Sequence, residues 1–239
     1  MKSIPDAPPN ALDLAARRDR RKNILDSAQR LFARYGYHGV TIRQIAADAR
    51  VPLALVGYYF GQKQELYDAI FGFVSETINQ RRQDLRAALA LQTGDRLQHI
   101  VSALVRPVVR ARLATPEGES YALFVARALS QQGVEEDRAI RQYFDPVAAE
   151  FIDALATSLA VNHPGFTHAH AAWGFQFALG ALLHYLTDQR VTRLSGGINA
   201  VGDPMVAAQL VAFIAHGLRG MAQAFADAET ATPALPVTL

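Results

Sequence analysis

The sequence predicts an all-α fold of about nine helices. Apolar residues recur at intervals of three and four positions in almost every segment, which is the spacing of one helix face. No run alternates regularly between apolar and polar residues, and the dipeptides Asn-Gly, Asp-Gly and Gly-Asn that mark two-residue β-hairpins do not occur. With 239 residues, half of them hydrophobic, the chain is long enough to bury one large core or two small ones.

The charge is unevenly distributed along the chain. Its 24 basic and 22 acidic residues give a net charge of +2. Residues 1–63 hold 11 basic and 5 acidic residues, a net charge of +6, whereas residues 64–239 hold 13 and 17, a net charge of −4. A basic first quarter joined to a mildly acidic body predicts a segment that binds a polyanion, and a solvated basic helix face is the alternative.

The composition argues against secretion and against a membrane partner. There is no cysteine, which excludes disulfides and thiolate chemistry and suits a reducing cytoplasm. The first residues include several prolines and lack the apolar core of a signal peptide. Polar residues interrupt the longest apolar stretches, residues 171–186 and 205–218, which are shorter than the ~20 residues of a membrane span. We therefore expect a cytoplasmic protein.

The first helix is expected over residues 17–35, after an N-terminal arm. Its apolar residues fall at positions i, i+4, i+7, i+8 and i+11, and these are Ile24, Ala28, Leu31, Phe32 and Tyr35. Gly36 ends this helix, because glycine readily adopts the left-handed conformation that follows a helix C-terminus.

Two short helices follow the first helix and are joined by a tight turn. Thr41 and Gln44 have the spacing of a capping box, which begins the first of them. Pro52 then interrupts the helical pattern, and a third helix is expected over residues 53–60, ended by Gly61. This arrangement predicts a helix-turn-helix, whose second short helix enters the DNA major groove.

Side chains of these helices are candidates for contacts with double-stranded DNA. Thr41 lies at a helix N-terminus, where a hydroxyl and free N–H groups bind phosphate, and Arg43 is one turn further on. Tyrosine hydroxyls and a lysine ammonium suit phosphate oxygens, while apolar side chains suit thymine methyl groups. The predicted DNA-binding residues are Thr41, Arg43, Leu53, Ala54, Gly57, Tyr58, Tyr59 and Lys63.

The rest of the chain is expected to form longer helices. Asp95 has the position of a helix cap, and the helix after it contains Pro107. Asp-Pro pairs beginning at Asp145 and Asp203 each indicate a helix N-terminus. The expected helices cover residues 63–91, 95–113, 119–131, 167–190 and 204–226 and a segment from 145, with a glycine-rich loop at 194–202.

Aromatic residues of the body suggest a ligand pocket. Trp173, Phe177 and His184 lie at positions i, i+4 and i+11 of the expected penultimate helix, and Tyr121 and Phe124 come from an earlier one. We expect these five residues to line a pocket for a small hydrophobic effector with one polar end. Ordinary core packing is the alternative for each of them.

The sequence gives no support for catalysis, for a metal site or for a cofactor. The motifs G-x-S-x-G, H-E-x-x-H and G-x-x-x-x-G-K do not occur. His163, His168 and His170 are close in sequence, but no carboxylate lies between them, and side chains two positions apart on a helix diverge. We therefore expect a protein that is not an enzyme.

Residues 24–70 resemble the N-terminal domain of the TetR family of bacterial transcriptional regulators. The resemblance rests on the order and spacing of Ile24, Ala28, Leu31, Phe32, Gly36, Tyr37, Thr41, Ile45, Ala46, Val51, Tyr58, Phe60, Lys63, Leu66 and Tyr67. It implies a homodimer that binds a palindromic operator, with a C-terminal domain that dimerises and holds a small effector. Effector binding would respace the recognition helices and release the DNA.

The resemblance also implies that the last two helices form a four-helix bundle with those of a second copy. Both helices carry small residues, which allow close approach, and large apolar residues for burial. The predicted interface residues are Ala178, Ala181, Leu182, Leu210, Phe213 and Gly217. Core packing within one subunit is the alternative.

Three positions depart from the family pattern. Arg50 replaces a glycine that usually has a positive φ, Pro52 replaces a hydroxyl N-cap, and Gly57 stands where tyrosine or asparagine is common. A helical carrier or enzyme with a degenerate DNA-binding head is therefore the alternative to a ligand-responsive repressor. The expected domains are an arm (1–16), a helix-turn-helix domain (17–62), an effector-binding and dimerisation domain (63–226) and a flexible tail (227–239).

Overall fold

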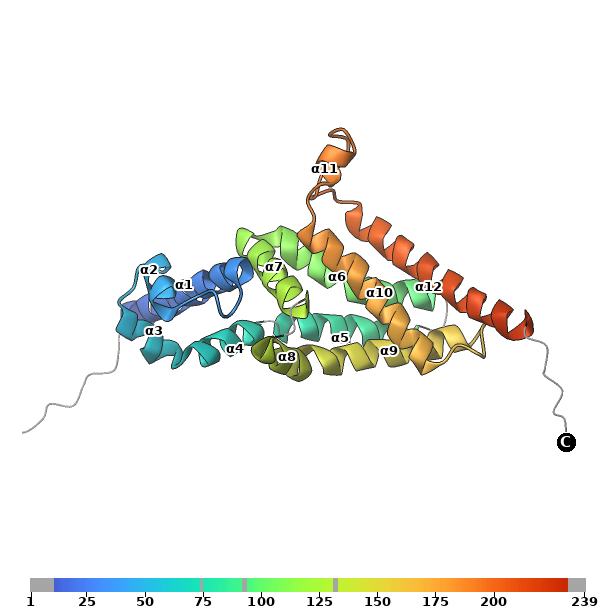
Figure 1. The fold of residues 1–239 in the computed structure, drawn as a ribbon, viewed down its shortest axis with the longest axis horizontal. Coiled ribbons are helices and arrows are strands. Elements are labelled where there is room, and N and C mark those ends of the chain that lie inside the picture. The colour runs from blue at the N-terminus through green and yellow to red at the C-terminus, as the bar shows by residue number, and fades with distance from the viewer. Residues whose placement is uncertain (1–10, 74, 92–93, 131–132, 232–239) are drawn as a thin grey trace, which may run out of the picture. The chain divides into compact units, whose positions relative to one another are not determined.

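The computed structural model describes residues 11–73, 75–91, 94–130 and 133–231, and these are helical almost throughout (Figure 1). They form twelve α-helices and one π-helical turn, compared with the nine or so helices expected. Their packing divides the chain into two compact units, Met1–Phe73 and Val74–Leu239. Within the described residues, no helix is long and apolar enough to cross a membrane.

The first unit contains helices α1 (Ala11–Tyr35), α2 (Ile42–Asp48), α3 (Leu53–Phe60) and α4 (Lys63–Phe73). Each helix contributes to one core, with Ile24, Phe32, Ile45, Val56, Leu66 and Ile70 all buried. The ring of Tyr67 on α4 packs edge-on against Phe32 of α1, with 5.1 Å between centroids. Because α4 buries its apolar side here, it belongs to the first unit and not, as the sequence suggested, to the second domain.

The start of α2 and the turn between α2 and α3 have the geometry expected from the sequence. Thr41 and Gln44 form the capping box: the Gln44 amide donates to the Thr41 hydroxyl, and the Thr41 amide donates to Gln44 Oε1 at 2.8 Å. Arg50 has a φ of +54° and is the only non-glycine residue with a positive φ in the described ranges. Pro52 stands at the N-cap of α3 and makes no side-chain capping bond.

The second unit is built around a central helix, α6 (Arg96–Ala114), which contains the buried Pro107. It packs against four helices: α5 (Ser75–Ala90), α7 (Pro116–Ser130), α9 (Asp145–Ala160) and α12 (Val206–Ala231). Helix α10 (His168–Thr187) in turn lies against α7, α9 and α12. One helical run leads through α8 (Val134–Ala139) and the π-helical turn η1 (Ile140–Phe144) into α9. The short α11 (Val191–Leu194) projects from the connection between α10 and α12 (Figure 1).

Several expected boundaries differ from those of the structure. The helix expected over residues 63–91 is two helices, α4 and α5, on either side of residue 74, which lies outside the described residues. The expected arm overlaps α1, because residues 11–16 are helical. Similarly, residues 227–231 of the expected tail belong to α12, and the rest of the arm and tail lies outside the described residues.

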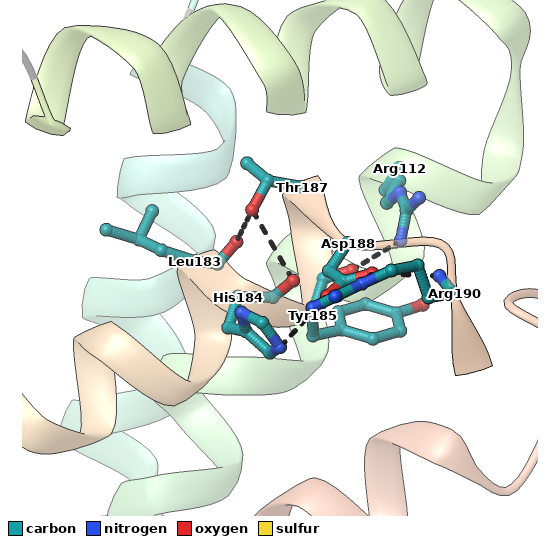
Figure 2. A network of polar contacts seen from close by, with 7 residues as sticks. All are labelled: Arg112, Leu183, His184, Tyr185, Thr187, Asp188 and Arg190. Carbon is teal, nitrogen blue, oxygen red and sulfur yellow. Dashed lines mark hydrogen bonds and ion pairs between the residues drawn. The ribbon is translucent and has the colours of Figure 1, made fainter. Parts of the chain in front are cut away.

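A network of polar contacts holds the C-terminal end of α10 (Figure 2). The buried Arg112 guanidinium of α6 donates to the Tyr185 carbonyl at 3.0 Å and lies over the Tyr185 ring. Asp188 accepts hydrogen bonds from the backbone N and the Nε of Arg190, each at 2.8 Å, and lies 3.3 Å from His184 Nε2. These contacts determine where α10 ends and where the connection to α12 begins.

Arg50→Gly should stabilise the first unit. Glycine adopts a positive φ without the Cβ clash that costs other residues about 1–2 kcal/mol, although it loses more backbone entropy on folding. We expect the free energy of unfolding to rise by up to about 1 kcal/mol in urea denaturation. Arg50→Ala retains the unfavourable backbone conformation and is the matched control, so equal stability of the two variants would contradict this explanation.

The Asp188 contacts should make stability depend on pH. Hydrogen bonds from Arg190 hold the pKa of the Asp188 carboxyl well below its usual range. The stabilisation is therefore present above the unfolded pKa of about 4 and is lost as the pH falls through the lower, folded pKa. We expect Asp188→Asn to lower the free energy of unfolding, measured in urea, by more at pH 7 than at pH 3. The exposed Asp19→Asn is the control, and a pH-independent Asp188→Asn deficit would refute the assignment.

Candidate functional site

Four of the predicted DNA-binding residues meet at one place on the first unit. Thr41 and Arg43, from the start of α2, line a shallow surface depression together with Leu53 and Gly57 of α3. All four are exposed, and there is open space around the position that a Gly57 Cβ would occupy. The absence of a side chain at Gly57 therefore allows a ligand surface to approach the α3 backbone closely.

The remaining predicted DNA-binding residues continue from this depression along α3 to the start of α4. Ala54 is exposed, and Tyr58 is 71% exposed with its ring packed edge-on against Tyr59. Lys63 is half-buried, and its Nζ lies 4.2 Å from the centroid of the Tyr37 ring, so a cation–π contact orients it. Partial burial lowers the Lys63 pKa from its ordinary value.

Not all of the basic charge of the first unit is available to a polyanion. Lys22 pairs with Asp26 at 2.6 Å, and Arg30 pairs with Asp48 at 2.7 Å. By contrast, the described residues provide no ion-pair partner for the exposed side chain of Arg43. The positive charge that is not paired therefore includes Arg43, which borders the depression.

The second unit encloses a cavity of about 400 Å³ between α5, α6, α7, α9, α10 and η1. Most of its wall is aliphatic or aromatic, and Ile140 and Phe144 of the π-helical turn contribute to it. Single π-helical turns within α-helices occur frequently at functional sites. A cavity of this size and character is typical of sites for small apolar ligands.

A few polar side chains also border this cavity. Arg81 of α5 is only 9% exposed, and its Nε donates to the Leu104 carbonyl at 3.1 Å. Burial lowers the pKa of Arg81 to about 10, which leaves the guanidinium charged at neutral pH. The Tyr121 hydroxyl of α7 is buried and has no hydrogen-bond partner among the described residues. Burial raises the Tyr121 pKa, so the hydroxyl stays protonated.

Only one of the five residues that the sequence predicted for the ligand site lines this cavity. Tyr121 lines the cavity, and Phe124 is buried but does not line it. Trp173 and Phe177 are 63% and 61% exposed, and the exposed His184 lies beside Asp188. None of these three lines the cavity, because their stripe is on the outward face of α10. The inward face of α10 instead presents Phe175, Leu179, Leu182 and Leu186 to the cavity.

Arg81 was not predicted as a site residue, although the sequence held an indication of its position. It lies three residues after Ile78 and four after Thr77 in the helix expected over residues 63–91. Residues with these spacings share one helix face, and all three line the cavity. An arginine on an otherwise apolar helix face is the sequence pattern that would have indicated Arg81 as a site residue.

The predicted dimer residues divide into exposed and buried sets. Phe213 is 71% exposed and Gly217 is exposed, while Ala181 and Leu210 are half-buried. Ala178 and Leu182 are buried inside the unit, and Leu182 lines the cavity, so neither is accessible to a second copy. The exposed members lie on α12, and Trp173 and Phe177, whose rings stack at 5.8 Å, lie on α10, which packs against it.

The closely spaced histidines have separate structural contacts. His168 lies 3.2 Å from Asp153, while the His170 ring stacks on Phe225 and its Nδ1 accepts from the Thr167 amide. Within the described ranges, no group of three or more histidine or acidic residues is placed to hold a metal ion.

Two family models and a curated relative match this chain. The model described as "Bacterial regulatory proteins, tetR family" matches residues 24–70, and "Tetracyclin repressor-like, C-terminal domain" matches residues 102–217. The transcriptional repressor KstR of Mycobacterium tuberculosis is 32% identical over 181 residues, which cover 71% of this chain and 77% of KstR. The chain belongs to the TetR family.

Other TetR-family proteins match with lower coverage or lower identity. The regulator BetI of Agrobacterium fabrum is 33% identical over 121 residues, covering 51% of this chain, so the chain spans about half (55%) of BetI. The structure of FadR from Bacillus subtilis in complex with stearoyl-CoA has a TM-score of 0.54 at 13% identity, covering 82% of this chain and 98% of FadR. At this identity the likeness shows a shared fold.

Membership of the TetR family confirms two predictions from the sequence. The chain is an all-α protein with an N-terminal helix-turn-helix and a helical C-terminal domain. Its N-terminal domain matches the model of the bacterial regulatory proteins of the TetR family, as the resemblance of residues 24–70 implied.

Proposed function

We propose that this TetR-family protein is a repressor that binds a palindromic operator as a homodimer and is released by a small apolar effector. The observation that carries the proposal is the convergence of Thr41, Arg43, Leu53 and Gly57 on one exposed depression of the helix-turn-helix. A helical carrier or enzyme with a degenerate head would not need these side chains on one surface.

The roles of these residues follow from their chemistry. Thr41 and the free amides at the start of α2 suit a phosphate, and Arg43 suits a phosphate or a guanine edge. Tyr58 lies near the C-terminal end of α3 and Lys63 at the start of α4. They supply a hydroxyl and an ammonium for further phosphates. Leu53 and Ala54 present only apolar contacts, so thymine methyl groups are the base features that they suit.

The exposed face of α10 and α12 supports the homodimer. It carries Trp173, Phe177 and Phe213, each more than 60% exposed, and Gly217 leaves room beside them. Large contiguous apolar patches on soluble proteins mark interaction sites. A second copy would cover this patch with its own α10 and α12, giving a four-helix bundle with two-fold symmetry. A palindromic operator has the same two-fold symmetry.

The cavity of the second unit is the proposed effector site. Its apolar wall suits a hydrophobic molecule, and the structure of the FadR protein holds stearoyl-CoA. Helices α5, α6, α7, α9 and α10 all border the cavity, and α10 also carries the proposed dimer face. A ligand that moves α10 would therefore change the spacing of two recognition helices in a dimer and weaken operator binding.

Operator binding should depend on the phosphate contacts assigned to α3 and α4. We expect Lys63→Ala to weaken binding to a duplex selected from a random library, and to reduce the slope of log K against log salt concentration by about 1. Tyr58→Phe should weaken binding through the loss of one hydroxyl. Fluorescence anisotropy at several salt concentrations measures both effects.

Arg141→Ala is the matched control, because Arg141 is an exposed arginine of the second unit that pairs with Asp137. Its affinity and salt slope should equal those of the unchanged protein. The phosphate assignments fail if Lys63→Ala and Tyr58→Phe bind like this control. A protein that selects no duplex at all would favour the carrier or enzyme alternative.

Phe213→Glu should disrupt the dimer. A carboxylate in the middle of a buried apolar interface is costly to desolvate, so the variant should sediment as a monomer and bind the operator more weakly. Val134→Glu is the control, since Val134 is 81% exposed on α8, away from α10 and α12. Analytical ultracentrifugation distinguishes the species, and a Phe213→Glu protein that remains dimeric would exclude this face as the interface.

A further inference from the structure

The cavity contains a buried positive charge that no carboxylate of the described residues neutralises. Arg81 is 9% exposed, and among the described residues its recorded hydrogen-bond acceptor is the Leu104 carbonyl, which binds Nε. The described residues place no carboxylate within ion-pair distance of Arg81. An unpaired buried charge is expensive, and such groups are normally paired or used in binding.

A second polar group beside Arg81 also lacks a partner. The Tyr121 hydroxyl is buried without a hydrogen bond to any described residue, and it is close enough to Arg81 for the positive charge to act on its pKa. Both side chains line the same cavity, and Thr77, one helical turn before Arg81, adds a hydroxyl to the wall. A buried donor without an acceptor destabilises the fold, because it has lost its hydrogen bonds to water without replacing them.

These groups share one chemical property, which is that they can donate hydrogen bonds. The guanidinium is purely a donor, and a phenol that stays protonated offers its O–H. The complementary ligand group is a compact anion that only accepts, and arginine binds carboxylates through two parallel hydrogen bonds. The rest of the cavity wall is predominantly apolar.

We infer that the effector is an apolar monocarboxylate whose carboxylate binds Arg81 and Tyr121 while its hydrocarbon part fills the cavity. The inference rests on the proposed role of this cavity as the effector site and specifies the chemical class of the effector. Within the described part of the cavity wall, Arg81 is the only cationic side chain, so the position of the anion is defined. Asp145, the acidic residue of the wall, is exposed and acts on Arg141.

A free acid fits this arrangement better than a coenzyme A thioester. Esterification to coenzyme A removes the carboxylate charge from the end of the acyl chain and leaves an uncharged thioester carbonyl. The negative charges then lie on phosphates of the nucleotide part, at the opposite end of the pantetheine arm from the thioester. The buried Arg81 would again lack an anion.

The test compares acids with their uncharged esters on the full-length protein without DNA. The probes are decanoate, 4-phenylbutyrate and cyclohexanebutyrate, each with its methyl ester, together with decanoyl-CoA. Isothermal titration calorimetry should show at least one acid that binds about tenfold more tightly than its ester and than decanoyl-CoA. If no acid binds more tightly than its ester, or if decanoyl-CoA is preferred, the inference is overturned.

Tyr121→Phe separates ligand binding from folding. Because the hydroxyl makes no hydrogen bond in the fold, its removal should leave the ligand-free melting temperature unchanged or raise it. The same variant should lose about tenfold in affinity for the acid and should bind the ester as before. A Tyr121→Phe protein with an unchanged preference for acid over ester would remove Tyr121 from the site.

Tyr185→Phe is the matched control. The Tyr185 hydroxyl donates to the Val201 carbonyl outside this cavity, so its removal should lower the melting temperature and leave the acid preference intact. Arg81→Gln should abolish the preference, and its melting temperature reports whether it still folds. Failure of the acid preference in a protein that binds operator DNA would refute this inference alone, whereas failure of operator binding would refute the proposed function.

Discussion

The second unit depends on the fact that α10 is apolar on two faces. Phe175, Leu182 and Leu186 face inward and help to enclose the cavity, while Trp173 and Phe177 face outward and remain exposed. One unit can bury only one of these faces, so the outer face is left for another surface. The same helix therefore connects the proposed ligand site to the proposed dimer interface, which is the mechanical link that a ligand-responsive regulator requires.

The cavity wall combines many weak apolar contacts with very few polar groups. Apolar burial favours hydrophobic ligands in general and distinguishes poorly among them, because removing a methylene group changes binding by only about 1–3 kcal/mol. A buried donor set such as Arg81 and Tyr121 discriminates more strongly, since a ligand without an acceptor leaves those donors unpaired. In the proposed complex, a matching carboxylate would offset the cost of burying these donors.

The DNA-binding unit shows how a departure from a family pattern is accommodated. Arg50 adopts the positive φ that a glycine would favour, and the capping box at Thr41 and the burial of Val56 hold the turn on either side. The backbone geometry of the helix-turn-helix is therefore retained despite an unfavourable residue. The exposed guanidinium at this turn also adds to the positive charge of the unit.

Local sequence patterns were sufficient for the helix-turn-helix and the capping box at Thr41, because each depends on residues a few positions apart. The positive φ at Arg50 was implied only by the family resemblance. Local patterns also predict the DNA-binding residues, of which the structure brings Thr41, Arg43, Leu53 and Gly57 to one surface depression. By contrast, local sequence patterns could not predict which face of α10 is turned towards the cavity. Trp173 and Phe175 are both aromatic, and only the packing of α10 against α7, α9 and α12 decides which of them faces the cavity. The burial of Arg81 likewise required the helices that surround it, because an arginine is exposed in most sequence contexts.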